Sequence, residues 1–133
     1  MFKQFSPIHE MSEKSHFDSC VVGLVVLRSA DIEKAVAFYS ALGLVFAKHD
    51  HPPCGKHYAT TVGECVLEIC RRKKEAPASQ STIGLSVSSI DRGLRIATEL
   101  GGQLRRSPES SEWGRTATIT DLDGNTVILM ERQ

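Results

Sequence analysis

The sequence predicts an α+β fold in which a βαβββ unit occurs twice and the two mixed sheets curl into a cup with the helices outside. Two observations carry this prediction. A pattern of strand, cap, helix and terminating glycine recurs at a constant offset, and three short strand-like segments follow each copy. The length of 133 residues and the 41% hydrophobic content suit one globular domain with a real core.

The first copy begins with residues 21–27, an apolar and β-branched segment typical of a strand with both faces covered. Ser29 or Asp31 can cap the next helix, because either side-chain oxygen accepts a hydrogen bond from the first turn. Apolar side chains recur at helical spacing over residues 32–42, and the glycine that follows is expected to end the helix.

The second copy has the same order, with a strand over residues 83–87, a cap at Ser89 and a stop at Gly101. A constant offset through all these features indicates two copies of one supersecondary unit. The equivalent pairs, each 58 residues apart, are Leu27 and Leu85, Ile32 and Ile90, Leu42 and Leu100, and Gly43 and Gly101.

Three strands are expected after each helix, joined by hairpin turns at Gly63-Glu64 and Asp123-Gly124-Asn125. One helix covers only one face of such a sheet, so the other face must meet a partner or enclose a ligand. The expected strands are residues 44–48, 57–62 and 65–70 in the first half, and 103–106, 115–121 and 126–130 in the second.

The organisation we expect is a flexible tail over residues 1–19 and a single domain over 20–133, built from repeats 20–75 and 82–131. Sixteen basic and sixteen acidic residues cancel, which disfavours nucleic acid and anionic membranes as partners. No apolar run approaches the roughly 20 residues of a membrane span. Four cysteines without a CxxC pair, and no signal-peptide pattern, favour a reducing cytoplasm.

The helix that starts Asp31-Ile-Glu-Lys-Ala-Val-Ala-Phe-Tyr resembles the first helix of the vicinal oxygen chelate superfamily. This superfamily includes glyoxalase I, bleomycin-resistance proteins, fosfomycin-resistance enzymes and extradiol dioxygenases. Trp113-Gly114-Arg115, followed by the segment 121–125, is similar to the last hairpin of the superfamily. The resemblance covers residues 20–131 and implies the glyoxalase-like fold and a homodimer, because these domains often complete their sheets across a two-fold axis.

In metal-using members of that superfamily, each half supplies one histidine from its first strand and one glutamate from its last strand. The matching positions here are Leu24 and Thr82 for the histidines, and Glu68 and Ile128 for the glutamates. Leucine and isoleucine have no lone pair to donate, and a threonine hydroxyl is a poor ligand for Zn²⁺ or Ni²⁺. We therefore predict a pocket without metal or cofactor, in which Glu68 is the one surviving acid.

Glu68 is the leading candidate for chemistry. Burial beside Leu24 and Ile128 is expected to favour its protonated form, which suits general acid or base catalysis or a hydrogen bond to a ligand. The alternative is a carboxylate paired with an arginine such as Arg115. Arg115 itself either holds an anionic ligand group or pairs with Asp121 or Asp123.

Residues 49–58 hold three of the five histidines, and their prolines and glycine predict a loop. Their spacing matches no known metal motif, so we predict no metal, with an atypical site around His49, His51, Cys54 and His57 left open. His57 either serves as a pocket donor and proton carrier or caps the strand edge in solvent. Trp113 either stacks on a planar ligand or packs as a lid on the protein.

Three functions follow from these residues. The first is a binding module for a small organic molecule, without metal, in the manner of bleomycin-resistance proteins; the neutral charge makes bleomycin itself an unexpected ligand. The second is a metal-free lyase or isomerase that uses Glu68, assisted by His57 or Arg115. The third, disfavoured by the lost ligands, is a metal-dependent lyase of the glyoxalase type. Whether the chain is an enzyme stays open at this point.

Overall fold

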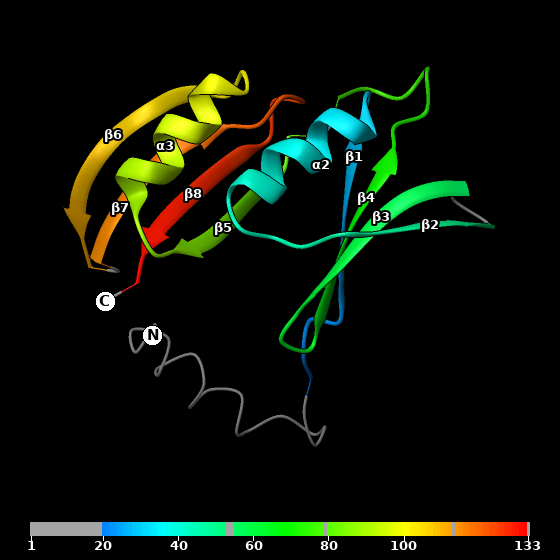
Figure 1. The fold of residues 1–133 in the computed structure, drawn as a ribbon, viewed down its shortest axis with the longest axis horizontal. Coiled ribbons are helices and arrows are strands. Elements are labelled where there is room, and N and C mark those ends of the chain that lie inside the picture. Colours follow the sequence, from blue (N-terminus) through cyan, green and yellow to red (C-terminus); the bar gives the residue numbers. More distant parts are fainter. Residues whose placement is uncertain (1–19, 53–54, 79, 113, 133) are drawn as a thin grey trace.

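The computed structural model describes residues 20–52, 55–78, 80–112 and 114–132. The expected tail, Cys54 and Trp113 lie outside these residues. The described chain forms two four-stranded mixed sheets, each with one helix on one face (Figure 1). This confirms the predicted α+β architecture of two βαβββ units, whose sheets are curled but not closed.

The first unit has strand order β1-β4-β3-β2, with β1 parallel to β4 and the remaining pairs antiparallel. Its one helix, α2, follows β1 directly. The elements are β1 (Leu24–Ser29), α2 (Ile32–Ala41), β2 (Ala47–His51), β3 (Gly55–Val62) and β4 (Cys65–Arg71).

The second unit repeats this topology in the order β5-β8-β7-β6, again with one parallel pair, β5 with β8. Two register shifts interrupt the pairing of β6 with β7. The elements are β5 (Thr82–Val87), α3 (Ile90–Glu99), β6 (Gln103–Ser111), β7 (Gly114–Thr120) and β8 (Thr126–Glu131).

The internal repeat extends to the residues that cap the two helices. Asp31 accepts a hydrogen bond from the backbone N–H of Lys34 at 3.2 Å, and Ser89 accepts one from Arg92 at 3.2 Å. Of the two caps proposed for the first helix, Asp31 is therefore the one used. Gly43 and Gly101 end the helices with φ of 115° and 104°, values that favour glycine.

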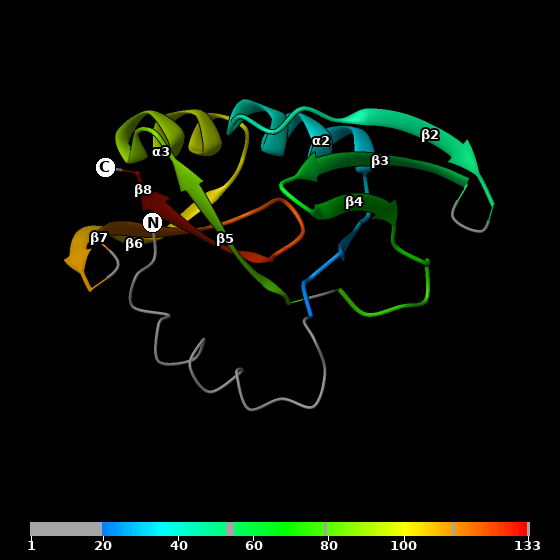
Figure 2. The same cartoon turned by 90° about the horizontal axis from the view of Figure 1, so that it is seen from below.

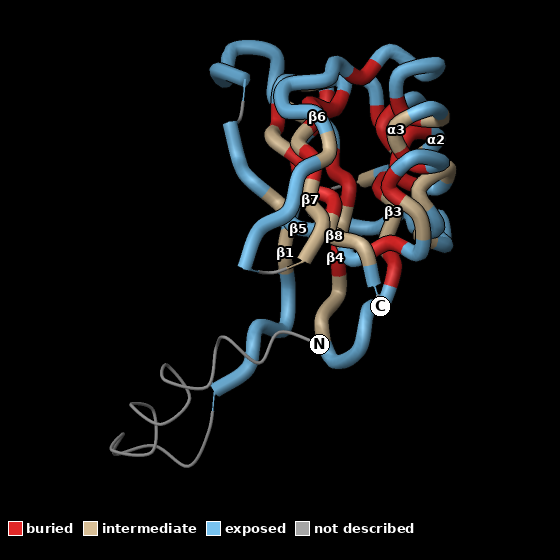
Figure 3. Tube along the Cα trace, turned by 90° about the vertical axis from the view of Figure 1, so that its left-hand side faces the viewer, coloured by how far each residue is buried: buried red, intermediate tan, exposed pale blue. Residues whose placement is uncertain are grey.

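A single hydrophobic core joins the two units (Figure 3). The helices lie next to each other on the same side of the sheets, and they contact each other (Figure 2). The core side chains come from the inner faces of both helices and of five strands, namely Leu27, Ile32, Ala35, Phe38, Tyr39, Leu67, Ile69, Val87, Ile90, Ala97, Ala117, Ile119, Val127 and Leu129.

Three strand predictions miss a limit by three residues or more, and the others by one or two. The first strand starts at Leu24 rather than at residue 21, and Val21 and Val22 are exposed. The second covers residues 47–51 rather than 44–48, and β6 continues to Ser111 through its bulges. Apolar composition alone located the first two strands, whereas their limits depend on which residues find a partner strand. Within the described chain, no helix is long and apolar enough to cross a bilayer.

Candidate functional site

The face of the first sheet that is turned away from α2 carries the predicted site. Leu27 and Ile69 are register partners, and both are buried beneath the helix. Side chains alternate along a strand, so their neighbours Val26 and Glu68 point to the opposite face. We call this the open face; the register assigns to it Leu24, Val26, Val66, Glu68, Cys70, His57, Ala59, His49 and His51.

The apolar part of the open face is exposed to solvent. Leu24 is 55% exposed and Val26 is 36% exposed. The expectation that the first strand is covered on both faces is therefore wrong for the single chain. The physical reason is the number of layers, because each sheet has a helix on one face only and the two sheets do not close on each other.

Glu68 lies half-buried in the middle of β4. The thiol of Cys70 donates to its Oε1 at 3.8 Å, which is a long, weak contact. Arg115 is not its partner, so the predicted alternative of a Glu68–Arg115 ion pair is wrong. Glu68 therefore presents a carboxylate on the same face as Leu24 and Val26.

Ile128 occupies the equivalent place in the second sheet. It is the register partner of Gly84, as Glu68 is of Val26, and Gly84 stands 58 residues after Val26. The structural repeat therefore equates Glu68 with Ile128. Thr82 is exposed at the start of β5, and the four positions are divided between the two sheets, Leu24 and Glu68 in the first and Thr82 and Ile128 in the second.

A cleft of about 660 Å³ opens elsewhere, between the end of α2 and the β5–α3 connection. Leu42 and Leu44 line one side, and Ser89, Arg92 and Arg132 line the other. None of the described residues that were predicted for the pocket lines this cleft, so the sequence did not indicate it.

His57 is only 3% exposed, which makes the expectation of a solvent-facing cap wrong. Its Nδ1 lies 2.9 Å from the carbonyl oxygen of Gly55. Its register partners are Cys70 on one side and His49 on the other. His57 therefore lies on the open face in the same row as those two residues, but its ring is shielded from solvent.

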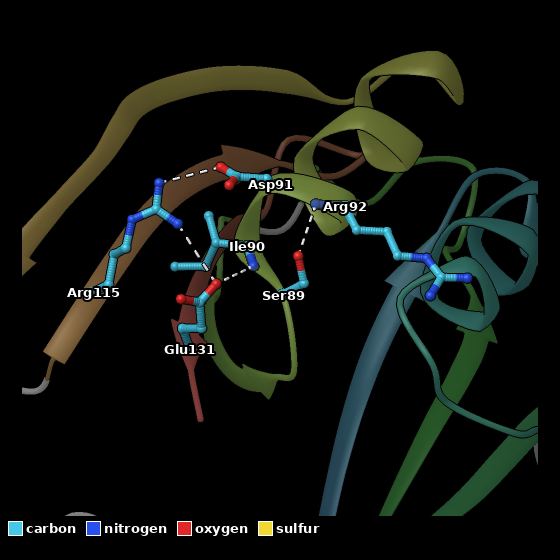
Figure 4. Close-up of polar contacts among 6 residues, drawn as sticks. All are labelled: Ser89, Ile90, Asp91, Arg92, Arg115 and Glu131. Carbon is cyan, nitrogen blue, oxygen red and sulfur yellow. Dashed lines mark hydrogen bonds and ion pairs between the residues drawn. The ribbon is translucent and has the colours of Figure 1, made fainter. Parts of the chain in front are cut away.

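Arg115, on β7, lies on the face of the second sheet that α3 covers, and its side chain reaches the start of that helix (Figure 4). Its guanidinium contacts Asp91 at 3.2 Å and Glu131 at 3.6 Å, which replaces the predicted pairing with Asp121 or Asp123. Glu131 also accepts the backbone N–H of Ile90 at 2.7 Å. Arg115 therefore helps to hold the start of the helix and does not join Glu68 or Ile128.

Asp121 uses both carboxylate oxygens inside the β7–β8 turn. Oδ1 accepts the backbone N–H groups of Asp123 and Asn125, each at 2.9 Å, and Oδ2 accepts the Asn125 amide at 2.9 Å. The hydroxyl of Tyr39 also donates to Oδ2, at 2.6 Å. The predicted turn is confirmed, whereas sequence reasoning missed Tyr39, which the helical stripe marked only as a core residue.

The pKa of Tyr39 is raised well above its usual 10.0, first by burial and then by the negative charge of Asp121. The phenol thus stays protonated and serves as a donor. Within the described residues, no group of three or more histidine, cysteine, aspartate or glutamate side chains could hold a metal ion.

Residues 21–129 match the sequence profile of the family described as Glyoxalase/Bleomycin resistance protein/Dioxygenase superfamily. The chain belongs to this superfamily. The match covers both βαβββ units, and it confirms the resemblance drawn from the helix and hairpin motifs.

Individual relatives are distant. An uncharacterized protein of Mycolicibacterium smegmatis (strain ATCC 700084 / mc(2)155) is 23% identical over 108 residues, which are 80% of this chain and 90% of that protein. The antibiotic binding protein TnmS3 from Streptomyces sp. CB03234 is 24% identical, with a TM-score of 0.67 over 89% of this chain and 100% of its own. A bleomycin-binding protein complexed with bleomycin is 24% identical, with a TM-score of 0.57 over 86% of this chain and 100% of its own. At this identity the structures share the fold.

Proposed function

We propose that this member of the superfamily binds a small organic molecule on its open face, with Glu68 as the polar anchor and without a metal at that position. The observation that carries the proposal is the exposure of Leu24 and Val26 beside a half-buried carboxylate. Small-molecule sites combine apolar walls with a few polar groups that fix orientation. A planar or amphipathic ligand with an N–H or cationic group suits these side chains.

The structural neighbours support this kind of function. One of them is described as an antibiotic binding protein and another is complexed with bleomycin. Both superpose over most of this chain. The balance of sixteen basic and sixteen acidic residues gives this chain no net attraction for a strongly cationic drug, so we expect a ligand other than bleomycin.

A second copy of the chain completes the site in this proposal. The open face is too shallow to enclose a ligand in one chain, because its sheet does not close. A symmetric partner would bury Leu24 and Val26 and supply the missing wall.

Cys20 and Cys65 are free thiols, and we therefore also propose the reducing cytoplasm as the location.

Sedimentation velocity tests the second copy. We expect the wild-type chain to be a dimer and Val26→Asp to be a monomer, because a charge would be buried in the interface. Val45→Asp is the matched control, since Val45 is 83% exposed in a connection, and this variant is expected to stay dimeric. A monomeric wild type at micromolar concentration, or a dimeric Val26→Asp, would contradict this part of the proposal.

The ligand site is tested with a panel of neutral and cationic planar aromatic compounds, screened by the shift in melting temperature and then titrated by calorimetry. We expect at least one compound to bind and Glu68→Gln to weaken it tenfold or more. Arg115→Gln is the control, because Arg115 faces α3, and it is expected to bind like wild type. A panel without binders, or equal affinity in Glu68→Gln, would overturn the proposal. If the wild-type chain converts a bound compound to a product and Glu68→Gln does not, the same site is catalytic.

A further inference from the structure

The cleft between the end of α2 and the β5–α3 connection has the size of a ligand site. Its volume of about 660 Å³ lies within the range of small-molecule pockets, which is about 300–1,000 Å³. Leu42 and Leu44 line it from the first unit, and Ile96 and Met130 add apolar surface from the second. No residue of the open face lines the cleft, so it is separate from Glu68.

Two arginines and no acidic residue line the cleft within the described chain. Arg92 comes from the first turn of α3, and Arg132 directly follows β8. The chain as a whole has sixteen basic and sixteen acidic residues, so this excess of positive charge is local. A concave surface lined by charges of one sign concentrates a ligand of the opposite sign, and the cleft therefore favours an anion.

Arg92 forms no ion pair with a carboxylate of the described residues. The acidic side chains at the start of α3 are Asp91 and Glu131, and both contact Arg115 instead. The side chain of Arg92 extends away from these three residues (Figure 4). Its guanidinium is thus available to a ligand, and it can bind two oxygens of a carboxylate or phosphate at once.

Arg132 is held against the backbone of β5. Its Nη1 donates to the carbonyl oxygen of Ser86 at 3.0 Å. A guanidinium has five N–H donors, so this hydrogen bond positions the side chain and leaves other donors for a ligand. Like Arg92, it has no carboxylate partner among the described residues.

The outer edge of β5 adds backbone donors to the cleft. β5 is the end strand of the second sheet, so it has a partner strand on one side only. The carbonyl oxygens of Ser81 and Val87 accept hydrogen bonds from the β8 side. Because the backbone groups alternate in direction along a strand, Gly84 and Ser86 direct theirs to the outer edge, and both residues line the cleft.

We propose that this cleft binds a small amphipathic anion, whose carboxylate or phosphate group is held by Arg92 and Arg132. The apolar part of the ligand packs against Leu42 and Leu44. Burial of that part favours an organic anion over inorganic phosphate. The site differs from the open face in the charge of its ligand, because the open face presents a carboxylate and suits a neutral or cationic compound.

The test is titration of the ¹⁵N-labelled full chain with hexanoate, hexyl phosphate and hexanamide, followed by ¹H–¹⁵N correlation spectra. The three probes share one saturated chain and differ in charge, and they are unlike the planar aromatic panel used for Glu68. We expect hexanoate or hexyl phosphate to bind about tenfold more tightly than hexanamide or better, and to shift the amide signals of Gly84, Ser86 and Arg92. The anion that binds more tightly identifies the head group.

Arg92→Gln is expected to weaken binding of that anion about tenfold, and it should fold because Arg92 is exposed. Arg95→Gln is the matched control, since it removes the same charge from the same helix at an exposed residue that does not line the cleft. It should bind like wild type. No binding of either anion, equal binding of hexanamide, equal affinity in Arg92→Gln, or an equal loss in both variants would overturn the proposal.

Glu68→Gln separates this site from the one on the open face. We expect this variant to bind the anion like wild type, because Glu68 does not line the cleft. A loss of anion binding in Glu68→Gln would place the anion on the open face and contradict the assignment to the cleft. A failure of the anion titration leaves the proposal for Glu68 standing, since that site is measured with other compounds.

Discussion

Tyr39 of α2 donates a 2.6 Å hydrogen bond to Asp121, which lies 82 positions further along the chain in the β7–β8 turn. The same turn reaches the first unit a second time, since Asp123 accepts the backbone N–H of Ala30 at 3.0 Å. These contacts fix the second unit against the start of α2 and its buried face. Hydrogen bonds depend on direction, so these two contacts define the relative position of the two units more closely than apolar packing alone would.

Replacing Tyr39 with phenylalanine should destabilise the fold. The change removes a buried hydrogen bond to a carboxylate, and such bonds contribute about 1.5–3 kcal/mol. Urea denaturation should show a lower midpoint with an unchanged m-value. Tyr58→Phe is the control, because the hydroxyl of Tyr58 contacts Glu33 in solvent; it should unfold close to wild type. Equal midpoints for Tyr39→Phe and wild type would contradict the assigned role.

The stability of the wild-type chain should fall at alkaline pH. Burial and Asp121 raise the pKa of Tyr39 in the folded state, whereas the unfolded chain titrates near 10.0. Above that pH the native state binds more protons than the unfolded state, so the contribution of Tyr39 is complete below pH 10 and declines above it.

One such group changes the free energy of unfolding by up to about 1.4 kcal/mol per pH unit. Denaturation curves between pH 8 and 11 should therefore converge for wild type and Tyr39→Phe. Curves that stay parallel over this range would show that Tyr39 titrates normally.

Gly102 is expected to tolerate no side chain. An added Cβ would lie 2.8 Å from the backbone oxygen of Thr120, 2.8 Å from Cε1 of Phe38 and 3.0 Å from the backbone oxygen of Ala97. Overpacking against such fixed atoms costs about 1–3 kcal/mol, so Gly102→Ala should melt lower than wild type. Gly23→Ala is the control, since a Cβ there meets nothing within 4 Å. Equal melting of the two variants would disprove the steric argument.

Gly93 should behave in the opposite way. It lies inside α3, and an added Cβ would meet Leu129 at 3.5 Å and Leu42 at 3.6 Å, which is ordinary contact. Alanine reduces the entropy of the unfolded chain and is favoured over glycine in a helix by about 0.5–1 kcal/mol. Gly93→Ala should therefore raise the midpoint of urea unfolding, and a lower midpoint would show that the α2–α3 contact has no room for a methyl group.

Features that are local and periodic could be read from the sequence alone. The 58-residue repeat, the cap at Ser89 and the stops at Gly43 and Gly101 are visible in it because each depends on neighbours within one turn or one strand, whereas the first cap was left open between Ser29 and Asp31. Alternation along β4 also placed Glu68 opposite the residues beneath the helix, since side chains on a strand have a fixed period of two.

How these segments pack against one another depends on contacts that form only in the folded chain. Strand pairing extended β2 to include His49 and His51, and placed His57 beside them, out of solvent. The packing of the two units gave Tyr39 its partner, and α3 gave Arg115 its two carboxylates. Each of these contacts joins residues far apart in the sequence. A local sequence pattern does not show which distant segments pack against each other.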